Sequence, residues 1–362
     1  MHRTKLVFIS VQRTSSLSRS YRALRSDSSG HGPVIEAQGA PELDERKAKT
    51  LLDKMIRAQC HHDMVRAEAR TMSCLEPEHA RHLERCASAF VDGAHRWLDA
   101  KSAPHMSLAE VDADVRGFAY EGAAMSAALA DVVAARPDSP ALRLLLAGEG
   151  WRYRHLVHVG VGWAMSMMRL PRPSVWRLDP LLRWLALDGA GFHDYYFADP
   201  TSRSRLLQVP VVRSGDTVRA QGYGRALWFA TSGDVQRIAR LVADAHPSRH
   251  ECTWAGVGLA AAYAGRPGPF VDELVVAAGP ALPQLRQGVR FGAVARHSAG
   301  GAVDERTRRL LLAVGAGTLE QASTRCEVEA RPRTVRRAGI ENYRSWQAAL
   351  TQAEPQSLRG AA

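Results

Sequence analysis

Residues 156–170 read LVHVGVGWAMSMMRL, in which only His158, Ser166 and Arg169 interrupt a run of apolar and small side chains. A helix of this composition is apolar around nearly its whole circumference, so none of its faces is suited to water. Such a helix lies inside a protein, covered on all sides by other elements. The run is shorter than the roughly 18 residues of a membrane span. We therefore expect a buried central helix and no transmembrane segment.

Helical spacing continues on both sides of this segment. Upstream, apolar residues recur every three or four positions over 108–132, and the motif Ser-Leu-Ala-Glu at 107–110 has the pattern of a capping box. Downstream, Asp-Pro at 179–180 is typical of a helix start, and we expect that helix to stop near Asp-Gly at 188–189. Pro and Gly punctuate the rest of the chain in the same way.

These patterns predict an all-α protein, a multi-helix globular bundle around the buried central helix. One exception is expected near 205–220, where Val209, Val211 and Val212 have the composition of a short hairpin.

Three segments of different composition divide the chain. Residues 1–45 are rich in Ser and Arg and are interpreted as a disordered basic arm. Residues 46–325 form the helical domain, and 326–362 form a basic helical tail.

A Gly-x-Gly-x-Ala pattern occurs at 160–164, 222–226 and 256–260. The intervals of 62 and 34 positions fit no single period, so the pattern does not establish a regular solenoid. None of the three follows a strand or carries the third glycine of a dinucleotide-binding loop. We interpret the glycines as positions where helices approach closely, in preference to phosphate binding.

The charge does not indicate nucleic-acid binding. The 362 residues include 48 Lys plus Arg and 37 Asp plus Glu, a formal net charge of +11. Arg makes up nearly all of the basic residues and is spread along the chain, and no helix-turn-helix, zinc or aromatic RNA-binding signature is present. We expect no nucleic-acid partner.

Five cysteines, at positions 60, 74, 86, 252 and 326, form no C-x-x-C pair. Their odd number and wide spacing argue against a disulfide framework and against a zinc site. The cluster Cys60-His61-His62 points in different directions on a helix and is interpreted as a surface feature. A reducing cytoplasm is the expected location.

Several phrases occur together in a consistent order. They are RGFAYEGAAM at 116–125, HVGVGW at 158–163, LDPLLRW at 178–184, GYGRALWF at 222–229 and WAGVGL at 254–259. As a set they resemble the bacterial family of domain of unknown function 1702, over about 77–319. The resemblance implies a role in actinobacterial specialised metabolism, often described as enediyne biosynthesis, beside an iterative polyketide synthase that makes a polyene. It supplies no catalytic residues.

Two carboxylates lie at the margin of the apolar face of the helix expected over 108–132. At 100° per residue, Asp114 and Glu121 fall within about 60° of Phe118. A desolvated carboxyl has a raised pKa and can act as a general acid or base. The alternative is a pair of structural acids bonded to Arg or to the backbone. Both residues are catalytic candidates.

Further polar candidates come from other segments. Asp188 shares an inward face with Trp184, and His193 is expected on a rim or lid after a break at Gly189; both would assist catalysis. His158 is favoured as a core residue, with a ligand or acid–base role as the alternative. Arg225 is expected to bind the polar end of a ligand.

The substrate-binding candidates are residues whose aromatic or polar side chains suit a long unsaturated ligand: His158, Trp163, Trp184, Arg225, Trp228 and Tyr263. The spacing of His and acidic residues fits no metal motif, so no metal and no nucleotide cofactor are expected.

Two functions follow from these features. The first is an enzyme that isomerises or cyclises a long apolar polyene or isoprenoid with a buried carboxyl. The second is a non-catalytic carrier that shields such a molecule for partner enzymes. A helical scaffold without a ligand is the third interpretation, which a core without a cavity would favour.

Overall fold

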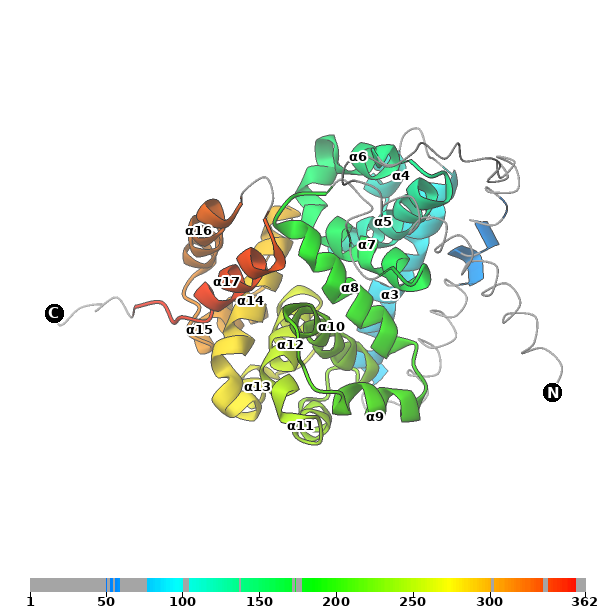
Figure 1. Cartoon of the computed structure of the whole chain (residues 1–362). Helices are drawn as coiled ribbons and strands as arrows, with labels where there is room; N and C mark the ends of the chain where they lie inside the picture. Colours follow the sequence, from blue (N-terminus) through cyan, green and yellow to red (C-terminus); the bar gives the residue numbers. More distant parts are fainter. Residues whose placement is uncertain are drawn as a thin grey trace, which may run out of the picture.

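The computed structural model describes residues 50, 53–54, 56–58, 77–99, 104–136, 138–170, 173, 178–300, 303–334 and 338–355. The described part of the chain contains helices and no strand, so the all-α prediction is confirmed (Figure 1). Its α-helices are α3 (Pro77–Asp99), α4 (Pro104–Ala109), α5 (Arg116–Val133), α6 (Pro140–Leu146), α7 (Arg154–Met167), α8 (Leu185–Tyr196), α9 (Pro200–Gln208), α10 (Ser214–Ala230), α11 (Val235–Ala243), α12 (His250–Tyr263), α13 (Val271–Ala278), α14 (Leu282–Ser298), α15 (Glu305–Ala313), α16 (Leu319–Ala330) and α17 (Ile340–Ala349). None of the helices described here is long and apolar enough to cross a membrane.

The long helices pack in a row that follows the chain. α3 packs on α5, and each of α5, α7, α8, α10, α12 and α14 packs on the one before it. From α8 onward a short helix follows each long one, and α13 contacts both α11 and α15 in a second layer. Figure 1 shows the short helices α9, α11 and α13 along one edge of the molecule, with α8, α10 and α12 beside them. The second half of the fold is therefore a two-layered helical repeat.

Gly-x-Gly triplets join the long helices. Residues i and i+2 of an α-helix point about 200° apart, so each triplet presents one glycine to each of two neighbours. In α10, Gly222 faces the carbonyl oxygen of Asp188 in α8, and Gly224 faces that of Thr253 in α12. A Cβ built on these glycines would lie 2.0 and 1.9 Å from the two oxygens. Only glycine permits so close an approach of two backbones.

The same arrangement occurs in four successive helices. The triplets are 160–162 in α7, 189–191 in α8, 222–224 in α10 and 256–258 in α12. In each, the first glycine faces the preceding helix and the second faces the following one. The interpretation of the Gly-x-Gly-x-Ala pattern as a helix-packing pattern is confirmed. The interval of 62 positions spans two helix-to-helix contacts, because the triplet at 189–191 lies between the other two. The intermediate triplet escaped the pattern because His193 stands where the others have Ala.

Successive long helices run in the same direction, as α12 and α14 show. Gly288 and Gly292, one turn apart, face the carbonyl oxygens of Ala255 and Leu259, which are one turn apart in the same order. The short helix between them returns the chain to its starting edge.

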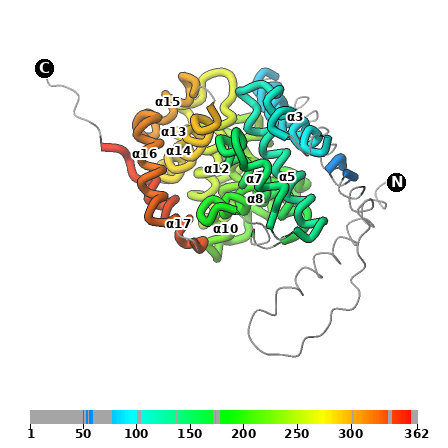
Figure 2. Tube along the Cα trace, turned by 90° about the horizontal axis from the view of Figure 1, so that it is seen from above, coloured from blue at the N-terminus to red at the C-terminus, as the bar shows by residue number. Residues whose placement is uncertain are grey.

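The row curves until its first helices meet α12. The rings of Phe118 in α5 and Tyr263 in α12 lie 5.3 Å apart, edge to face. His82 of α3 donates to the carbonyl oxygen of Ala264 at 2.8 Å. Figure 2, viewed from above, shows α7 and α8 between α5 and α12. α7 is buried from Leu156 to Met165, which confirms the predicted central helix.

The predicted capping box at 107–110 is wrong. α4 ends at Ala109 and α5 begins only at Arg116. The Arg116 side chain donates to the carbonyl oxygens of Ala109 and Val111 at 2.9 Å each, and Arg96 donates to that of Ser107 at 2.7 Å. These side chains stabilise a break that apolar spacing alone conceals.

Two other local predictions are also wrong. The helix expected to stop near 188–189 continues to Tyr196, because Gly189 packs against α7 instead of ending the helix. The hairpin predicted near 205–220 does not form, and the three valines lie in the connection between α9 and α10. There the N–H of Val211 donates to Ser248 Oγ at 2.9 Å and that of Val212 to Asp216 at 3.3 Å, so side chains take the bonds that a partner strand would make.

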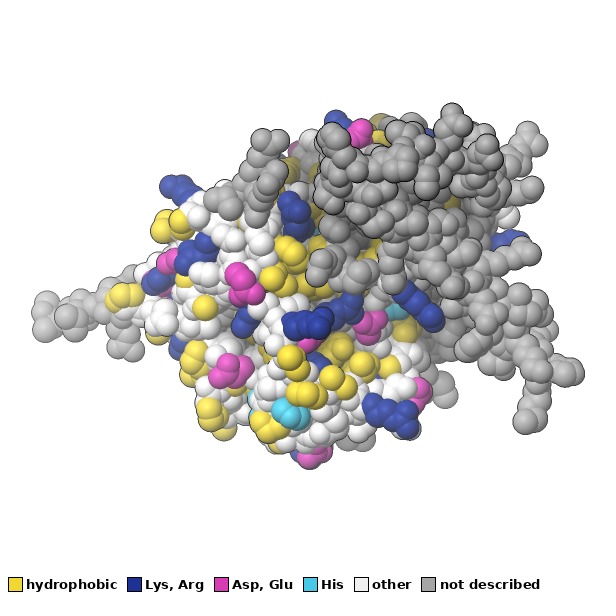
Figure 3. Space-filling model, viewed as in Figure 1, with side chains coloured by type: hydrophobic (Ala, Val, Ile, Leu, Met, Phe, Trp, Pro, Cys, Tyr) yellow, Lys and Arg dark blue, Asp and Glu magenta, His cyan; other side chains and the backbone are white. Residues whose placement is uncertain are grey.

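The segment predicted as a basic tail, 326–362, begins inside α16. α16 packs on α14, and α17 packs on α10. The predicted arm at 1–45 and Cys60-His61-His62 lie outside the described residues. Basic, acidic and apolar side chains are interspersed on the face seen in Figure 3.

Candidate functional site

A cavity of about 310 Å³ lies inside the curve of the helical row. This volume is in the range of small-molecule sites. Most of its walls are apolar, from the start of α7, the ends of α12 and α14, and α16. Its lining includes Phe118, His155, Leu156, Val159, Leu181, Leu185, Arg225, Phe229, Leu259, Tyr263, Phe291, Val294, Ser323, Cys326 and Trp346.

A buried ionic cluster lies next to the cavity and contributes Arg225 to its inner wall. Arg225 of α10 donates to Asp188 of α8 at 2.5 Å and to Glu121 of α5 at 3.5 Å. Glu121 also accepts a hydrogen bond from Trp163 Nε1 of α7 at 3.1 Å. All four side chains are buried. Three predicted site residues, Glu121, Asp188 and Arg225, are thus brought together from three helices.

Two glutamines extend the cluster to the C-terminal segment. Gln221 donates to the second oxygen of Asp188 at 2.8 Å, and Gln347 of α17 donates to Gln221 at 2.7 Å. Asp188 therefore has both oxygens occupied, and α17 is connected to the ionic cluster.

The guanidinium of Arg225 bonds to two carboxyl groups, and its single charge can balance only one negative charge. This favours a proton on the other carboxyl group. Burial raises the pKa of the Glu121 carboxyl, against the opposing effects of Arg225 and the Trp163 hydrogen bond. Burial also opposes the charge on Arg225, but Asp188 and Glu121 outweigh it and the pKa of Arg225 is raised. The arrangement that balances charge is Arg225 paired with Asp188, beside a protonated Glu121.

Glu121 faces a second, small cavity of about 30 Å³ that is walled by aromatic rings. Trp163 lies 4.2 Å from Phe90 and 5.4 Å from Phe192, measured between ring centroids. Phe118, Arg225 and Phe229 line both this cavity and the large one. The two cavities are therefore neighbours that share these three side chains.

The outer end of the large cavity is polar. Trp151, Glu327 and Thr334 line it with exposed side chains, so the opening lies there. Arg154 stacks on Trp151, 5.1 Å from its ring centroid. Burial lowers the pKa of Arg154, while Asp179 and Glu327 oppose that shift.

Two polar atoms of the cavity wall are buried and have no hydrogen-bond partner among the described residues. They are Nδ1 of His155 in α7 and Oγ of Ser323 in α16. Burial, aided by Arg154 and His158, lowers the pKa of His155 to about 3, so its ring is neutral. A buried polar atom without a partner is costly, and here both residues line the space that a ligand would fill.

Asp114 is not a buried carboxyl, contrary to the prediction. It lies in the turn before α5 and forms an ion pair with Arg85 at 3.1 Å, with 46% of its side chain exposed. The break between α4 and α5 places it outside the helical face assumed from the sequence.

His158 is a satisfied core residue. Its Nδ1 donates to the carbonyl oxygen of Arg154 at 2.6 Å, and its Nε2 accepts from the N–H of Asp179 at 3.3 Å. Both ring nitrogens are therefore used by the backbone. His158 lines neither of the two inner cavities.

The remaining aromatic candidates divide into two groups. Tyr263 lines the large cavity and Trp163 the small one. Trp184 donates to the carbonyl oxygen of Ala338 at 3.4 Å, and the fully buried Trp228 donates to that of Gly265 at 3.2 Å. These bonds hold helices and connections together, and neither ring lines a cavity described here.

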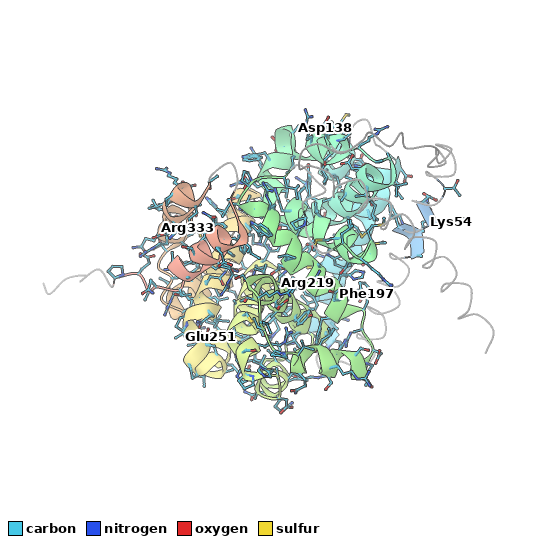
Figure 4. The ribbon with its side chains drawn as sticks, viewed as in Figure 1. Lys54, Asp138, Phe197, Arg219, Glu251 and Arg333 are labelled. Carbon is cyan, nitrogen blue, oxygen red and sulfur yellow. The ribbon has the colours of Figure 1, made fainter. Side chains whose placement is uncertain are left out.

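His193 lies in the last turn of α8, on no lid. Its ring is 5.6 Å from Trp163 and 5.0 Å from Phe197. The neighbouring Asp194 pairs with Arg219 at 2.5 Å. Figure 4 labels Phe197 and Arg219, which flank this second polar group at the end of α8. It fixes α8 to α10 and is separate from the Glu121 cluster.

Several residues that line the large cavity were not predicted from the sequence. α14 lines the cavity with Phe291, Val294, Ala295 and Ser298, and α16 lines it with Ser323, Cys326, Glu327 and Ala330. Both sets have helical spacing and look like ordinary core-facing stripes. The polar residues within them, Ser298, Ser323 and Glu327, were the available signal.

No group of three or more His, Cys, Asp or Glu side chains in the described ranges could hold a metal ion. The described cysteines, Cys86, Cys252 and Cys326, are buried free thiols. Burial raises the pKa of Cys326 to about 12, so this wall residue is a poor nucleophile.

A family model described as "Protein of unknown function (DUF1702)" matches residues 51–353. No curated protein and no solved structure matches the chain.

Proposed function

Since the chain belongs to the DUF1702 family of proteins of unknown function, we propose its activity from the cavity itself: it binds a long, apolar, unsaturated molecule and transfers protons to and from it through Glu121. The observation that carries this proposal is a buried carboxyl, Glu121, whose pKa is raised and which lines a small aromatic chamber next to a larger apolar cavity. A polyene or an isoprenoid has the required shape and reactivity.

The chemistry is acid–base isomerisation or cyclisation. Glu121 delivers its proton to one carbon of a double bond, which leaves a cation on the neighbouring carbon. The faces of Phe118, Trp163 and Phe192 stabilise that positive charge, and Arg225 stabilises the Glu121 carboxylate. Loss of a proton from an adjacent carbon to Glu121 restores the acid, with or without ring closure. No oxidant or nucleotide is required.

Asp188 is a positioning residue in this scheme. It neutralises Arg225 and fixes its orientation, and Gln221 and Gln347 hold Asp188 in place. The reacting part of the ligand reaches Glu121 by displacing the Phe118 and Phe229 rings, whose centroids are 6.1 Å apart.

A carrier is the second candidate function. It is favoured by the fact that Glu121 lines the small cavity and not the large one. In that case the cavity shields a reactive polyene for partner enzymes, among them an iterative polyketide synthase. Either function belongs to specialised metabolism, of the enediyne, polyketide or isoprenoid kind, and three buried free thiols suit a reducing cytoplasm.

Deuterium incorporation separates the two functions. Protein purified with its ligand from the native cells is transferred to D₂O, and the extracted molecules are measured by mass spectrometry. Catalysis through Glu121 predicts carbon-bound deuterium in molecules from the wild type and none from Glu121→Gln. A ligand present in both proteins without deuterium supports the carrier and contradicts the acid–base mechanism.

A further inference from the structure

We infer that the ligand has a single neutral oxygen function, a hydroxyl or a carbonyl, and that this end lies at the outer part of the cavity beside His155 and Ser323. The inference rests on the proposed function and adds the orientation of the ligand and the chemistry of its polar end. It also assigns His155 and Ser323 as specificity residues.

Arg225 is unsuited to bind the polar end of a ligand. Its guanidinium already binds Asp188 and Glu121, and it is 4% exposed. A carboxylate or phosphate at the inner end would add a negative charge to a buried cluster that has two acids and one base. The inner end therefore receives the hydrocarbon part of the ligand, contrary to the role predicted for Arg225.

Two residues of the cavity wall each have a polar atom without a hydrogen-bond partner among the described residues. His155 and Ser323 line the same cavity, and His155 Nδ1 and Ser323 Oγ are buried without a partner among the described residues. A neutral imidazole and a serine hydroxyl can each donate or accept a hydrogen bond. An oxygen on the ligand would satisfy these two atoms once their side chains turn toward the cavity.

The charges at the opening of the cavity disfavour a ligand that carries a carboxylate. Arg154 is the arginine that lines the opening in the described part of the chain, and Asp179 and Glu327 both act on it. Among these described lining residues, two acids face one base, which does not favour a ligand carboxylate. A neutral alcohol or ketone suits this environment better than an anion.

Three probes with the same C18 conjugated tetraene test the inference: the hydrocarbon, the primary alcohol and the carboxylic acid. Binding to the full-length protein is measured at pH 8 by quenching of tryptophan fluorescence. The alcohol is expected to bind about tenfold more tightly than either the hydrocarbon or the acid, as one or two good hydrogen bonds would give. Equal affinities for the three probes would overturn the inference and leave the apolar site intact.

Variants assign the effect to the two residues. Ser323→Ala removes one oxygen atom and is expected to abolish most of the preference for the alcohol, with the affinity for the hydrocarbon changed less than about twofold. His155→Phe is expected to act in the same way. Ser214→Ala is the control, because Ser214 binds Glu341 at the start of α10 and does not line the cavity. An alcohol preference that survives in Ser323→Ala and His155→Phe would overturn the assignment.

A cavity-filling variant distinguishes this failure from failure of the proposed function. Leu259→Trp places an indole in the large cavity, and Val294→Phe provides a second variant from another helix. Both are expected to weaken all three probes at least tenfold, with circular dichroism used to confirm folding. If all probes bind these variants as tightly as the wild type, the cavity is not the site and the proposed function fails.

Discussion

Arg225 of α10 lies 3.5 Å from Glu121 of α5, although the two residues are 104 positions apart in the chain. Asp188 lies closer to the same guanidinium, at 2.5 Å. Burial raises the pKa of Glu121, and the shared arginine, which is bonded more closely to Asp188, opposes that rise without reversing it. The following expectations test this cluster and the helical row that assembles it.

Glu121→Gln should flatten the dependence of stability on pH. The folded-state pKa of Glu121 is raised above the ordinary value of 4.5, so above pH 4.5 the unfolded chain loses a proton that the folded protein keeps. The contribution of Glu121 to stability is therefore present below pH 4.5 and falls as pH rises toward the folded pKa. Urea unfolding between pH 4.5 and 9 should show Glu121→Gln gaining stability relative to the wild type. A constant difference across this range would contradict a protonated Glu121.

Arg225→Met should destabilise the protein by about 3–5 kcal/mol, because it leaves the buried Asp188 carboxylate without its cation and Glu121 without one of its hydrogen-bond donors. Adding Asp188→Asn should recover part of that loss. Arg219→Met provides the comparison, because its pair with Asp194 is partly exposed, and it should cost about 1 kcal/mol or less. Chemical unfolding of the four proteins gives these differences. Equal costs for the two single arginine variants would show that burial of the cluster is unimportant.

Gly222→Ala should cost about 3 kcal/mol or more, since its Cβ would lie 2.0 Å from the Asp188 carbonyl oxygen. Gly215 lies in the same helix, where the nearest side-chain atoms to a new Cβ would be at 3.7 and 3.8 Å. Gly215→Ala should therefore stabilise the protein by about 0.5–1 kcal/mol through better helix propensity. Thermal unfolding of both variants measures the contrast. A tolerated Gly222→Ala would refute the close packing of α8 on α10.

Arg290→Met should loosen the C-terminal segment. This fully buried side chain donates to the carbonyl oxygens of Leu350 and Gln352 and to Glu354. Its removal should cost about 3 kcal/mol and speed hydrogen exchange across α17. The exposed pair Arg309 and Asp272 serves as control, and Arg309→Met should cost about 0.5 kcal/mol or less. Unchanged exchange in α17 would mean that Arg290 does not fix this segment.

The sequence predicted the parts of the fold that depend on local pattern. The buried central helix follows from 156–170, and the close helix packing follows from the Gly-x-Gly triplets. The break between α4 and α5 could not be predicted, because it depends on Arg96 and Arg116 bonding to carbonyl groups that apolar spacing does not reveal.

The ionic residues of the candidate site were selected from the sequence one by one, but their assembly was not predicted. Glu121, Asp188 and Arg225 were each selected from burial or neighbouring residues on separate segments. Their mutual neutralisation depends on how α5, α8 and α10 meet, which no single segment specifies. For the same reason Arg225 was assigned to a ligand when its partners lie within the protein.

The most direct test of the central claim is mass spectrometry of small molecules extracted from the wild type and from Leu259→Trp, both purified from the native cells. The proposed binding in the large cavity predicts an apolar unsaturated molecule in the wild type and at least a tenfold loss of it from the correctly folded variant. Equal amounts in both proteins, or no such molecule in the wild type, would contradict the claim that this cavity holds the ligand.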